Sequence, residues 1–463
     1  MGIAETALCV LDFQCVGDNV LPVLPSSYQR KFFAGALFTM FSSWVYFLLV
    51  CYSRIPVLLR QCYLISTGVY ILFALLNTSS VHYLIMSLLV FAQVRLISAR
   101  TLPITYLLST YAYLSCRLIH FMVVDKGETQ FHDSGLLMIL MARCTFMAFG
   151  VYDHMRLKKG HDEEVELTAL QLQNELDARP GFMDFFSYVY FSPFLFFGPC
   201  TPYKAVNDYI WLSQEEISKR PSFLPFLLQR FSLVIFFSVF FLVFADYAQD
   251  EWLVTSHHSI VVKWIWSVFI GELFKMRYYV AILFGECCAT ASGVGFSGFD
   301  QSKRAQFDSV LNMRIFDCIF PCSPKLLMEG WHITISQWLR YSVYERVPVM
   351  KTLAVFLASA LWHGFYTGIL LGIGYGAVLV LASRKMRRLL RHRVNTDSKL
   401  VQLTYDVITT AVSVLFSTPF MLIYNANDAD KVLPLVKSFL WMPTVICILV
   451  ALLPIQRPKS KTS

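Results

Sequence analysis

Apolar stretches of membrane-crossing length recur along this chain and constrain its fold more than any other feature. They lie near residues 32–52, 61–77, 81–97, 102–124, 135–151, 223–247, 258–274, 403–425 and 433–454. A helix of about 20 apolar residues crosses roughly 30 Å of hydrocarbon. The 56% content of hydrophobic residues is too high for a water-soluble globule. We therefore predict an all-α polytopic membrane protein, folded as one membrane-embedded domain over residues 1–463 with about ten or eleven spans.

The charge and the cysteines exclude several classes of protein. The net charge of +8 comes from basic residues scattered through loops, without the basic and aromatic module of a nucleic-acid-binding domain. Positive charge of this kind is typical of cytosolic loops, such as the one expected at SRKMRRLLRHR. The 12 Cys show neither paired CxxC spacing nor a secreted disulfide framework. We therefore expect the lipid bilayer as a partner, no nucleic acid and no bound metal.

Two histidines stand out against this apolar background. His363 lies inside the run ASALWHGFYTG, and His332 opens the amphipathic run GWHITISQWLRYSVYERVP. An ionisable side chain in a membrane segment is costly, so it is a candidate for function. Two helices that meet near Pro348 would place each histidine about fifteen residues, or roughly 22 Å, from the turn. Antiparallel packing would then bring both imidazoles to a similar depth in one cavity.

A neutral imidazole in an apolar chamber is suited to accept a proton. Burial lowers the pKa of a histidine and keeps its ring unprotonated near pH 7, which is the state that a general base needs. No GxSxG nucleophile elbow accompanies the histidines, so we expect direct attack by a bound hydroxyl rather than a covalent acyl-enzyme. From the residues alone, two alternatives stay open: a structural hydrogen bond, or a proton or ion pathway in a transporter or receptor.

Two further segments bear on an internal chamber. The aromatic stretch FMDFFSYVYFSPFLFFGPCTPYKAVNDYI is interrupted by prolines and glycine between residues 193 and 202. Broken backbone at membrane depth must be shielded by protein or line a cavity, so we expect this stretch to wall a chamber. A kinked spanning helix is the alternative. Glu286 lies among Cys, Ala, Ser and Gly residues and either orients a catalytic group or makes a structural hydrogen bond between helices.

Four segments form an ordered set of motifs. They are FFGPCTPYKAVNDY, KMRYYVAILFGECCATASGVGF, the companion motif GWHITISQWLRYSVYERVP and the histidine segment ASALWHGFYTG. Together they resemble the membrane-bound O-acyltransferases, the MBOAT family, in which the histidine of the last segment is invariant. With FDSVLNMRIFDCIF they are most similar to the lysophospholipid acyltransferase branch, and within it to the lysophosphatidylinositol acyltransferases. The motifs cover about residues 180–385, and the remainder matches by hydropathy only.

The resemblance implies an MBOAT-like helical bundle around an internal chamber, and an enzyme that moves a fatty acyl chain from acyl-CoA to the free hydroxyl of a lysophospholipid. Acyl-CoA would be a co-substrate that enters from the cytosol, and no other cofactor is implied. His363 would be the catalytic base. The family's companion motif has Asn where this chain has His332, which would polarise the carbonyl or position the substrate instead. A weakened or inactive relative is the alternative.

Several neighbouring side chains are candidates for substrate binding. We expect Trp331, Trp338 and Trp362 to wall the chamber, with plain packing as the alternative. Anionic groups, such as the phosphates of CoA or of a phospholipid headgroup, would attract Arg340, Arg346 and Lys351. Snorkelling of these basic side chains to the membrane interface is the alternative.

The tail KSKTS bears on localisation. Its residues Lys459 and Lys461 resemble a dilysine retrieval signal, so we expect a multi-pass protein of the endoplasmic reticulum membrane. A positive flank of the last helix is the alternative.

Within the same family, a peptide or a neutral lipid is the alternative acceptor. A homodimer is compatible with the sequence.

Overall fold

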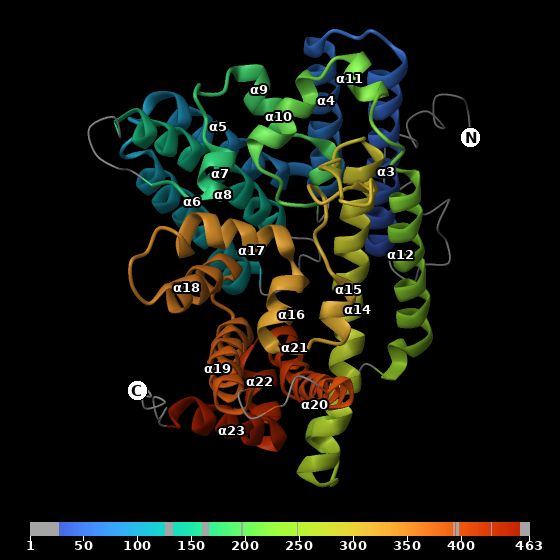
Figure 1. Cartoon of the computed structure of the whole chain (residues 1–463), viewed down its shortest axis with the longest axis vertical. Coiled ribbons are helices and arrows are strands. Elements are labelled where there is room, and N and C mark those ends of the chain that lie inside the picture. The colour runs from blue at the N-terminus through green and yellow to red at the C-terminus, as the bar shows by residue number, and fades with distance from the viewer. Residues whose placement is uncertain are drawn as a thin grey trace. The chain divides into compact units, whose positions relative to one another are not determined.

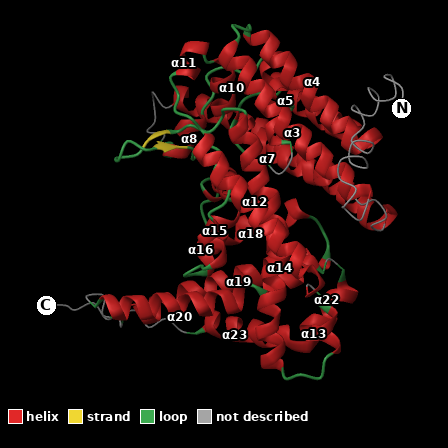
Figure 2. Cartoon of the chain, turned by 90° about the vertical axis from the view of Figure 1, so that its right-hand side faces the viewer, coloured by secondary structure: helices red, strands yellow, loops and turns green. Residues whose placement is uncertain are grey.

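The computed structural model describes residues 27–125, 133–159, 166–195, 198–247, 249–391, 394, 398–426 and 428–453. Helices make up most of this part of the chain, as the red ribbons of Figure 2 show. Its one pair of strands is short, with β1 (Gly298–Phe299) antiparallel to β2 (Ala305–Gln306). The predicted all-α class is therefore confirmed. Lys459 and Lys461 lie outside the described residues, so the retrieval signal stays a prediction.

The chain divides into two compact units, each assembled from segments far apart in the sequence. The first comprises Met1–Ile235, Ala281–Asn312 and Thr334–Lys351, and the second comprises Phe236–Val280, Met313–Ile333 and Thr352–Ser463. The first contains α3 (Ser27–Tyr52), α4 (Val57–Leu76), α5 (Ser80–Leu96), α6 (Leu102–His120), α7 (Ser134–Lys159), α8 (Ala169–Asn174), α9 (Phe182–Val189), α10 (Tyr203–Trp211) and α11 (Gln214–Ser218). The second contains α13 (Glu251–Thr255), α15 (Ile315–Ile319), α16 (Pro324–Trp331), α19 (Thr367–Leu390), α20 (Lys399–Ser417), α21 (Pro419–Asn425), α22 (Ala429–Leu435) and α23 (Trp441–Leu452). Four helices have residues in both: α12 (Leu224–Phe244), α14 (Ile260–Ala291), α17 (Ile333–Leu339) and α18 (Lys351–His363). The prediction of a single domain over the whole chain stays a prediction.

The core of the first unit forms around α7, whose Arg143 is only 1% exposed. This guanidinium lies 4.4 Å from the ring centroid of Tyr188 and donates to the Tyr188 carbonyl. Tyr188 belongs to the aromatic stretch, where α9 ends after eight residues and a short 3₁₀ turn (Ser192–Phe194) follows. Eight helical residues cover only about 12 Å, so this stretch is broken backbone shielded by protein and not a kinked spanning helix.

In the second unit, α19 packs against α21, α22 and α23, which lie around it in Figure 1. Two glycines of α19 face neighbouring helices. A Cβ on Gly372 would lie 3.4 Å from Cε2 of Phe420 and 3.5 Å from the backbone nitrogen of Tyr424. A Cβ on Gly376 would lie 3.3 Å from Cε of Met328. Gly372 thus faces α21, and Gly376 faces α16, with small residues where the helices meet.

Eight helical stretches of the described chain are long and apolar enough to cross a membrane. They are Arg30–Tyr52, Val57–Leu96, Leu102–Val124, Ser134–Lys158, Leu224–Thr255, Thr367–Leu390, Lys399–Asn425 and Ala429–Leu452. The chain is a multi-pass membrane protein. The range Val57–Leu96 contains two helices, α4 and α5, separated by the 3₁₀ turn Asn77–Ser79, so the spans predicted near 61–77 and 81–97 correspond to separate helices. The span predicted near 258–274 belongs to the 32-residue α14, which carries Lys263, Glu272 and Lys275 and is not among the eight.

One predicted loop is helical. The basic residues from Arg384 to Arg388 lie in the last turns of α19, which continues to Leu390. Straight-chain basic residues are good helix formers and are favoured near a helix C-terminus. The helix that begins in the apolar segment therefore continues through them.

Candidate functional site

The chain around His332 is fixed by two short helices that pack closely. Helix α16 starts at the N-cap Ser323, whose hydroxyl accepts from the Leu326 N–H at 3.2 Å. A Cβ on Gly330 would lie 2.8 Å from Cβ of Asp317 in α15, so this position requires glycine. The Gly330 carbonyl also accepts from the Arg314 N–H at 3.0 Å. These contacts set the end of α16 and the direction in which the next residues leave it.

His332 lies at the break between α16 and α17, where its φ of −148° and ψ of 79° interrupt the helix. The residue is half-buried, but its Nδ1 atom is buried and has no hydrogen-bond partner among the described residues. A buried polar atom without a partner is costly, so such an atom in a native protein is often reserved for a ligand.

His363 is the last residue of α18, which is 13 residues long. That length covers only about 20 Å, less than the hydrocarbon thickness of a bilayer. The next residue, Gly364, has a φ of 108°, and its N–H donates to the Ala360 carbonyl at 3.1 Å. A glycine with positive φ is the usual device that ends a helix. The histidine is therefore presented at a helix end, immediately before α19 begins at Thr367.

A tyrosine from α21 holds the His363 ring. The Tyr424 hydroxyl lies 3.1 Å from Nδ1 of His363, and the two rings meet edge-on with centroids 5.6 Å apart. The Trp362 ring covers another side of the imidazole, at 4.7 Å between centroids. Within the described residues, the bond to Tyr424 is the one hydrogen bond of the His363 ring, so Nε2 has no protein partner.

The two imidazoles act on one another and both are kept neutral. Both lie outside the eight candidate spans. Burial lowers the pKa of His363 to about 4. Burial, together with the nearby His363 ring, lowers the pKa of His332 to about 3. Near pH 7 both rings are therefore unprotonated, and each has a nitrogen that is able to accept a proton or to bind a substrate group.

The predicted tryptophans lie in different places. Trp331 packs between the rings of Tyr278 and Tyr279, with centroids 5.9 and 5.6 Å away. Trp331 and Trp362 belong to the same unit as the two histidines, and Trp338 belongs to the other unit. Trp338 is 1% exposed, and its indole N–H donates to the Thr145 hydroxyl at 3.0 Å. Packing therefore accounts for Trp338 without a substrate.

Glu286 lies in a buried polar network of the first unit. Its carboxylate accepts from the Asn312 N–H at 2.6 Å and lies 3.3 Å from Nε of Arg230 in α12. These contacts join α12, α14 and the segment that leads to α15. They agree with the alternative given for Glu286, which is a structural hydrogen bond between helices. The role of Glu286 at a substrate stays a prediction.

The three predicted anion-binding residues also have protein contacts in the first unit. Arg346 makes a two-pronged ion pair with Asp153, at 2.5 and 2.7 Å, and Asp153 is fully buried. Arg340 pairs with Glu345 at 2.9 Å on the surface. Lys351 lies over the Tyr344 ring at 5.3 Å. Each of the three basic groups thus has a partner within the protein. Phosphate binding by Arg340, Arg346 and Lys351 stays a prediction.

Sequence reasoning missed two polar residues, one that contacts His363 and one that holds the segment following His332. Tyr424 lies in an apolar span and is not marked by any local motif. Asn312 lies upstream of the companion motif, and its Oδ1 accepts from the N–H and the hydroxyl of Thr334, at 3.2 and 2.6 Å. Thr334 follows His332 by two positions, so Asn312 anchors the chain just after this histidine. Polar residues within apolar stretches were the one available signal for both.

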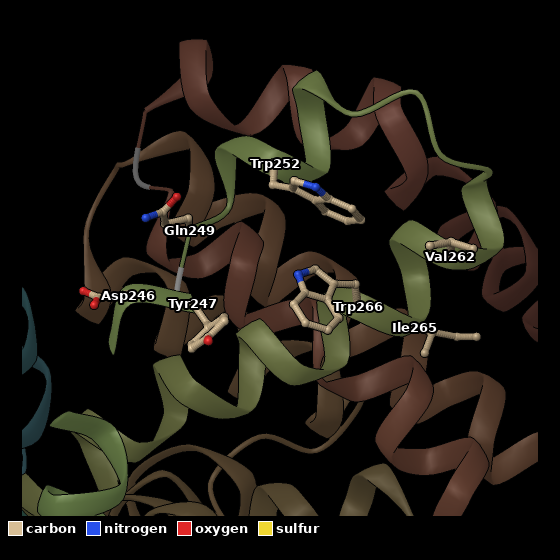
Figure 3. Close-up of a pocket in the computed structure, with 7 residues that line it drawn as sticks. All are labelled: Asp246, Tyr247, Gln249, Trp252, Val262, Ile265 and Trp266. Carbon is tan, nitrogen blue, oxygen red and sulfur yellow. The ribbon is translucent and has the colours of Figure 1, made fainter. Parts of the chain in front are cut away.

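An open groove of about 500 Å³ lies in the second unit, away from the histidines. Figure 3 shows Trp252 and Trp266 facing each other across it, and their ring centroids are 5.9 Å apart. Tyr247 and Asp246 lie at one side. Trp and Tyr gather where membrane meets water, so this groove is typical of a membrane interface. Neither histidine lines it, and the internal chamber stays a prediction.

The fold and the site define a class: a helical, multi-pass membrane protein with two neutral imidazoles, one of which, His363, lies beside a tyrosine hydroxyl. The sequence model of MBOAT, the membrane-bound O-acyltransferase family, matches residues 121–426, which is more than half of the chain. The chain therefore belongs to the membrane-bound O-acyltransferase family. The family expected from the four motifs is confirmed.

Curated relatives are similar to most of the chain. Lysophospholipid acyltransferase 6 of Drosophila melanogaster is 26% identical over 80% of this chain and 54% of its own length. Membrane-bound glycerophospholipid O-acyltransferase 1 of Mus musculus is 27% identical over 84% of this chain and 82% of its own. Lysophospholipid acyltransferase of Schizosaccharomyces pombe is 28% identical over 55% of this chain and 52% of its own. The chain thus spans about half the length of the fly and yeast proteins, and most of the length of the mouse protein.

Proposed function

We propose that this protein transfers a fatty acyl chain from acyl-CoA to the free hydroxyl of a lysophospholipid and so remodels membrane phospholipids. The names of the fly, mouse and yeast relatives support this reaction class and acceptor. The observation that carries the proposal is the state of His363. Its ring is neutral, its Nδ1 is held by Tyr424 and its Nε2 has no partner among the described residues.

In the proposed reaction, His363 acts as a general base through Nε2. The lysophospholipid hydroxyl oxygen attacks the thioester carbonyl carbon while Nε2 takes the hydroxyl proton. The tetrahedral intermediate then breaks its C–S bond, and the imidazolium returns the proton to the leaving CoA sulfur. The products are the phospholipid ester and the free thiol. General-base help of this kind contributes roughly 10² to 10⁴ in rate, and the remainder comes from holding both substrates in place.

His332 has a second role in this proposal. A neutral imidazole has one donor and one acceptor nitrogen, as the amide of Asn has one donor and one acceptor group. The buried Nδ1 without a partner among the described residues is available to bind a substrate group. We assign His332 to polarising the thioester carbonyl or positioning the acceptor, beside the base.

The bilayer supplies the lipid substrate, and we place the protein in the endoplasmic reticulum membrane on the strength of Lys459 and Lys461. Lysophosphatidylinositol is the acceptor that we would test first, because the motifs are most similar to that branch.

The test is an acyl transfer assay on purified protein in lipid nanodiscs with labelled acyl-CoA. The acceptors are lysophospholipids with inositol, choline, ethanolamine and serine headgroups, together with a peptide and a neutral lipid as competing classes. The proposal expects phospholipid product with at least one lysophospholipid, and no such product with His363→Ala. Product from the peptide or the neutral lipid alone would replace the proposed acceptor, and product from none would contradict the function.

A further inference from the structure

An open pocket of the first unit lies between the turn that joins α3 to α4 and the short helix α11. Its volume is about 590 Å³, which is in the usual range for a ligand site. Arg54 lines it from the turn, Arg60 from the first turn of α4, and Gln214 and Glu215 from α11. The Gln214 amide donates to the Cys51 carbonyl at 2.7 Å, and α11 packs against α3 (Figure 1). The two sides of the pocket are therefore joined by contacts within the protein.

Arg60 brings a buried positive charge to this pocket. The residue is only 6% exposed. Its Nη1 donates to the carbonyls of Ile210 and Leu212, at 3.2 and 2.6 Å, and its Nε donates to the Ile55 carbonyl at 3.2 Å. Its Nη2 has no hydrogen-bond partner within the described residues, and this atom is not sealed from solvent. The guanidinium thus has one unused donor, which is open to the pocket that the residue lines.

No carboxylate within the described chain balances the charge of Arg60. A buried charge is costly unless it is paired. The buried guanidinium of Arg346 is paired with Asp153, and that of Arg143 lies over the ring of Tyr188. Arg60 has neither kind of partner, and the carbonyl oxygens that it contacts carry only partial negative charge. An anion in the pocket would supply the missing charge.

Arg54 adds a second positive charge to the lining. It is exposed and makes no hydrogen bond or ion pair within the described residues. The acidic residue of the lining is Glu215, and its carboxylate lies 2.6 Å from the Lys219 ammonium. The pocket therefore has two arginines that lack acidic partners, and a carboxylate that already has a basic one. Planar guanidinium groups of this kind bind phosphate oxygens through paired N–H donors.

The surroundings of the pocket indicate the source of the phosphate. Arg54 lies between the candidate spans Arg30–Tyr52 and Val57–Leu96, where two membrane-crossing stretches end. Leu58 and Leu59 directly precede the buried arginine, and each is 56% exposed. Apolar side chains exposed at a span are suited to acyl chains, and the phosphates of a bilayer lie at its surface beside the ends of the spans. A phospholipid carries both groups in one molecule.

We propose that this pocket binds the phosphate of an anionic phospholipid headgroup. The donors are Nη2 of Arg60 and the guanidinium of Arg54, and the acyl chains lie against Leu58 and Leu59. The bound phosphate supplies the negative charge that Arg60 lacks and connects α4 to α11 through the ligand. The site goes beyond the proposed acyl transfer, because it belongs to the first unit while both histidines belong to the second.

The first measurement compares ligands for the purified full-length protein in detergent. Native mass spectrometry follows the binding of phosphatidic acid and of diacylglycerol with the same acyl chains, which differ in the phosphate alone. Calorimetry with inorganic phosphate tests a soluble source. Phosphatidic acid should bind roughly tenfold or more tightly than either of the others, because a hydrogen bond to a charged group is strong. Equal affinities for the two lipids would overturn the proposal, and tighter binding of inorganic phosphate would overturn the lipid source.

The second measurement repeats the lipid titration with two matched variants. Arg54→Gln removes a pocket charge from a side chain that makes no described contact, so the fold should be kept. Arg100→Gln removes an exposed charge between Val57–Leu96 and Leu102–Val124 that does not line the pocket. Arg54→Gln should weaken phosphatidic acid roughly tenfold and leave diacylglycerol unchanged, and Arg100→Gln should bind as the wild type does. An affinity of Arg54→Gln for phosphatidic acid within twofold of the wild type would overturn the proposal.

The third measurement reports on the connection between α4 and α11. Hydrogen exchange of the α11 amides, Gln214–Ser218, is followed in phosphatidylcholine nanodiscs with and without phosphatidic acid. Phosphatidic acid should slow this exchange severalfold in the wild type. Arg60→Lys keeps the charge but loses the two-pronged geometry, so it should lose most of the slowing. Exchange in the wild type that phosphatidic acid leaves unchanged would overturn the proposal, and if Arg60→Lys fails to fold, the Arg54→Gln titration still decides it. None of these measurements depends on turnover.

Discussion

The Oδ1 atom of Asn312 accepts two hydrogen bonds from Thr334, one from the backbone N–H at 3.2 Å and one from the hydroxyl at 2.6 Å. The same hydroxyl accepts a hydrogen bond from the Cys200 N–H at 2.8 Å. All three residues are buried. One hydroxyl thus connects three segments of the first unit at the start of α17, two positions after His332.

Replacement of Thr334 by valine should lower stability more than replacement by serine. Valine keeps the shape but leaves the Cys200 N–H and part of Asn312 without partners, whereas serine keeps the hydroxyl. A lost buried hydrogen bond of this kind costs about 1–3 kcal/mol. The melting temperatures of the purified variants in the same lipid should follow the order wild type, Thr334→Ser, Thr334→Val. Equal melting temperatures for serine and valine would show that the hydroxyl does not anchor this segment.

The pH dependence of acyl transfer should reflect a histidine with a lowered pKa. Burial lowers the pKa of His363 from 6.5 to about 4. The base must be unprotonated, and a lowered pKa keeps it so at more acidic pH, so kcat/KM should stay level from neutral pH down to about pH 5 and fall to half near pH 4. A half-maximal rate near pH 6.5 would mean that the ring is solvated in the working enzyme. Recovery of full activity after return to pH 7 controls for unfolding.

The variant His332→Asn should keep or increase activity, and His332→Leu should lose it. Asparagine restores the residue that the companion motif carries in the family, with one donor and one acceptor group. Leucine fills the space without polar atoms. Because a positioned polar donor to a developing oxyanion contributes about 10² to 10³ in kcat, we expect His332→Leu to lose a comparable factor. Full activity in His332→Leu would remove His332 from the site.

Arg346 should matter for stability and Arg340 should not. The pair of Arg346 with Asp153 is largely buried, and removal of one partner of such a pair costs about 3–5 kcal/mol. The Arg340 side chain is 67% exposed beside Glu345, and such surface pairs contribute about 0–1 kcal/mol. Melting of Arg346→Ala and Arg340→Ala gives the comparison. A raised KM for acyl-CoA in Arg346→Ala, with an unchanged melting temperature, would instead support the anion-binding role predicted from the sequence.

The helical class and the two histidines were predictable because they depend on local patterns. Apolar stretches of spanning length define the helices, and the turn near Pro348 separates the helical segments that carry His332 and His363. The structure places this turn between the π-helical segment Arg340–Tyr344 and the start of α18 at Lys351. The His363 ring contributes to the lowered pKa of His332, and both residues belong to the second unit.

The partners of the site residues were not predictable, because packing brings them from distant parts of the chain. Tyr424 lies 61 positions after His363, and Asp153 lies 193 positions before Arg346. No local period marks a tyrosine in an apolar helix as a hydrogen-bond partner. An arginine whose carboxylate partner is far away in the sequence resembles an anion ligand until the fold is known. Sequence patterns therefore identified candidate groups for the chemistry but not the residues that contact them.

The proposed acyl transfer depends most on the imidazole of His363, and one comparison tests this role directly. Wild type, His363→Ala and the packing control Trp338→Phe are purified into nanodiscs, and the initial rate of acyl transfer from acyl-CoA to lysophospholipid is measured at equal protein. We predict that His363→Ala loses about 10² to 10⁴ of the wild-type rate while the protein remains folded at the assay temperature. Trp338→Phe should keep its rate within severalfold of the wild type. Acyl transfer at the wild-type rate by folded His363→Ala protein would contradict the account.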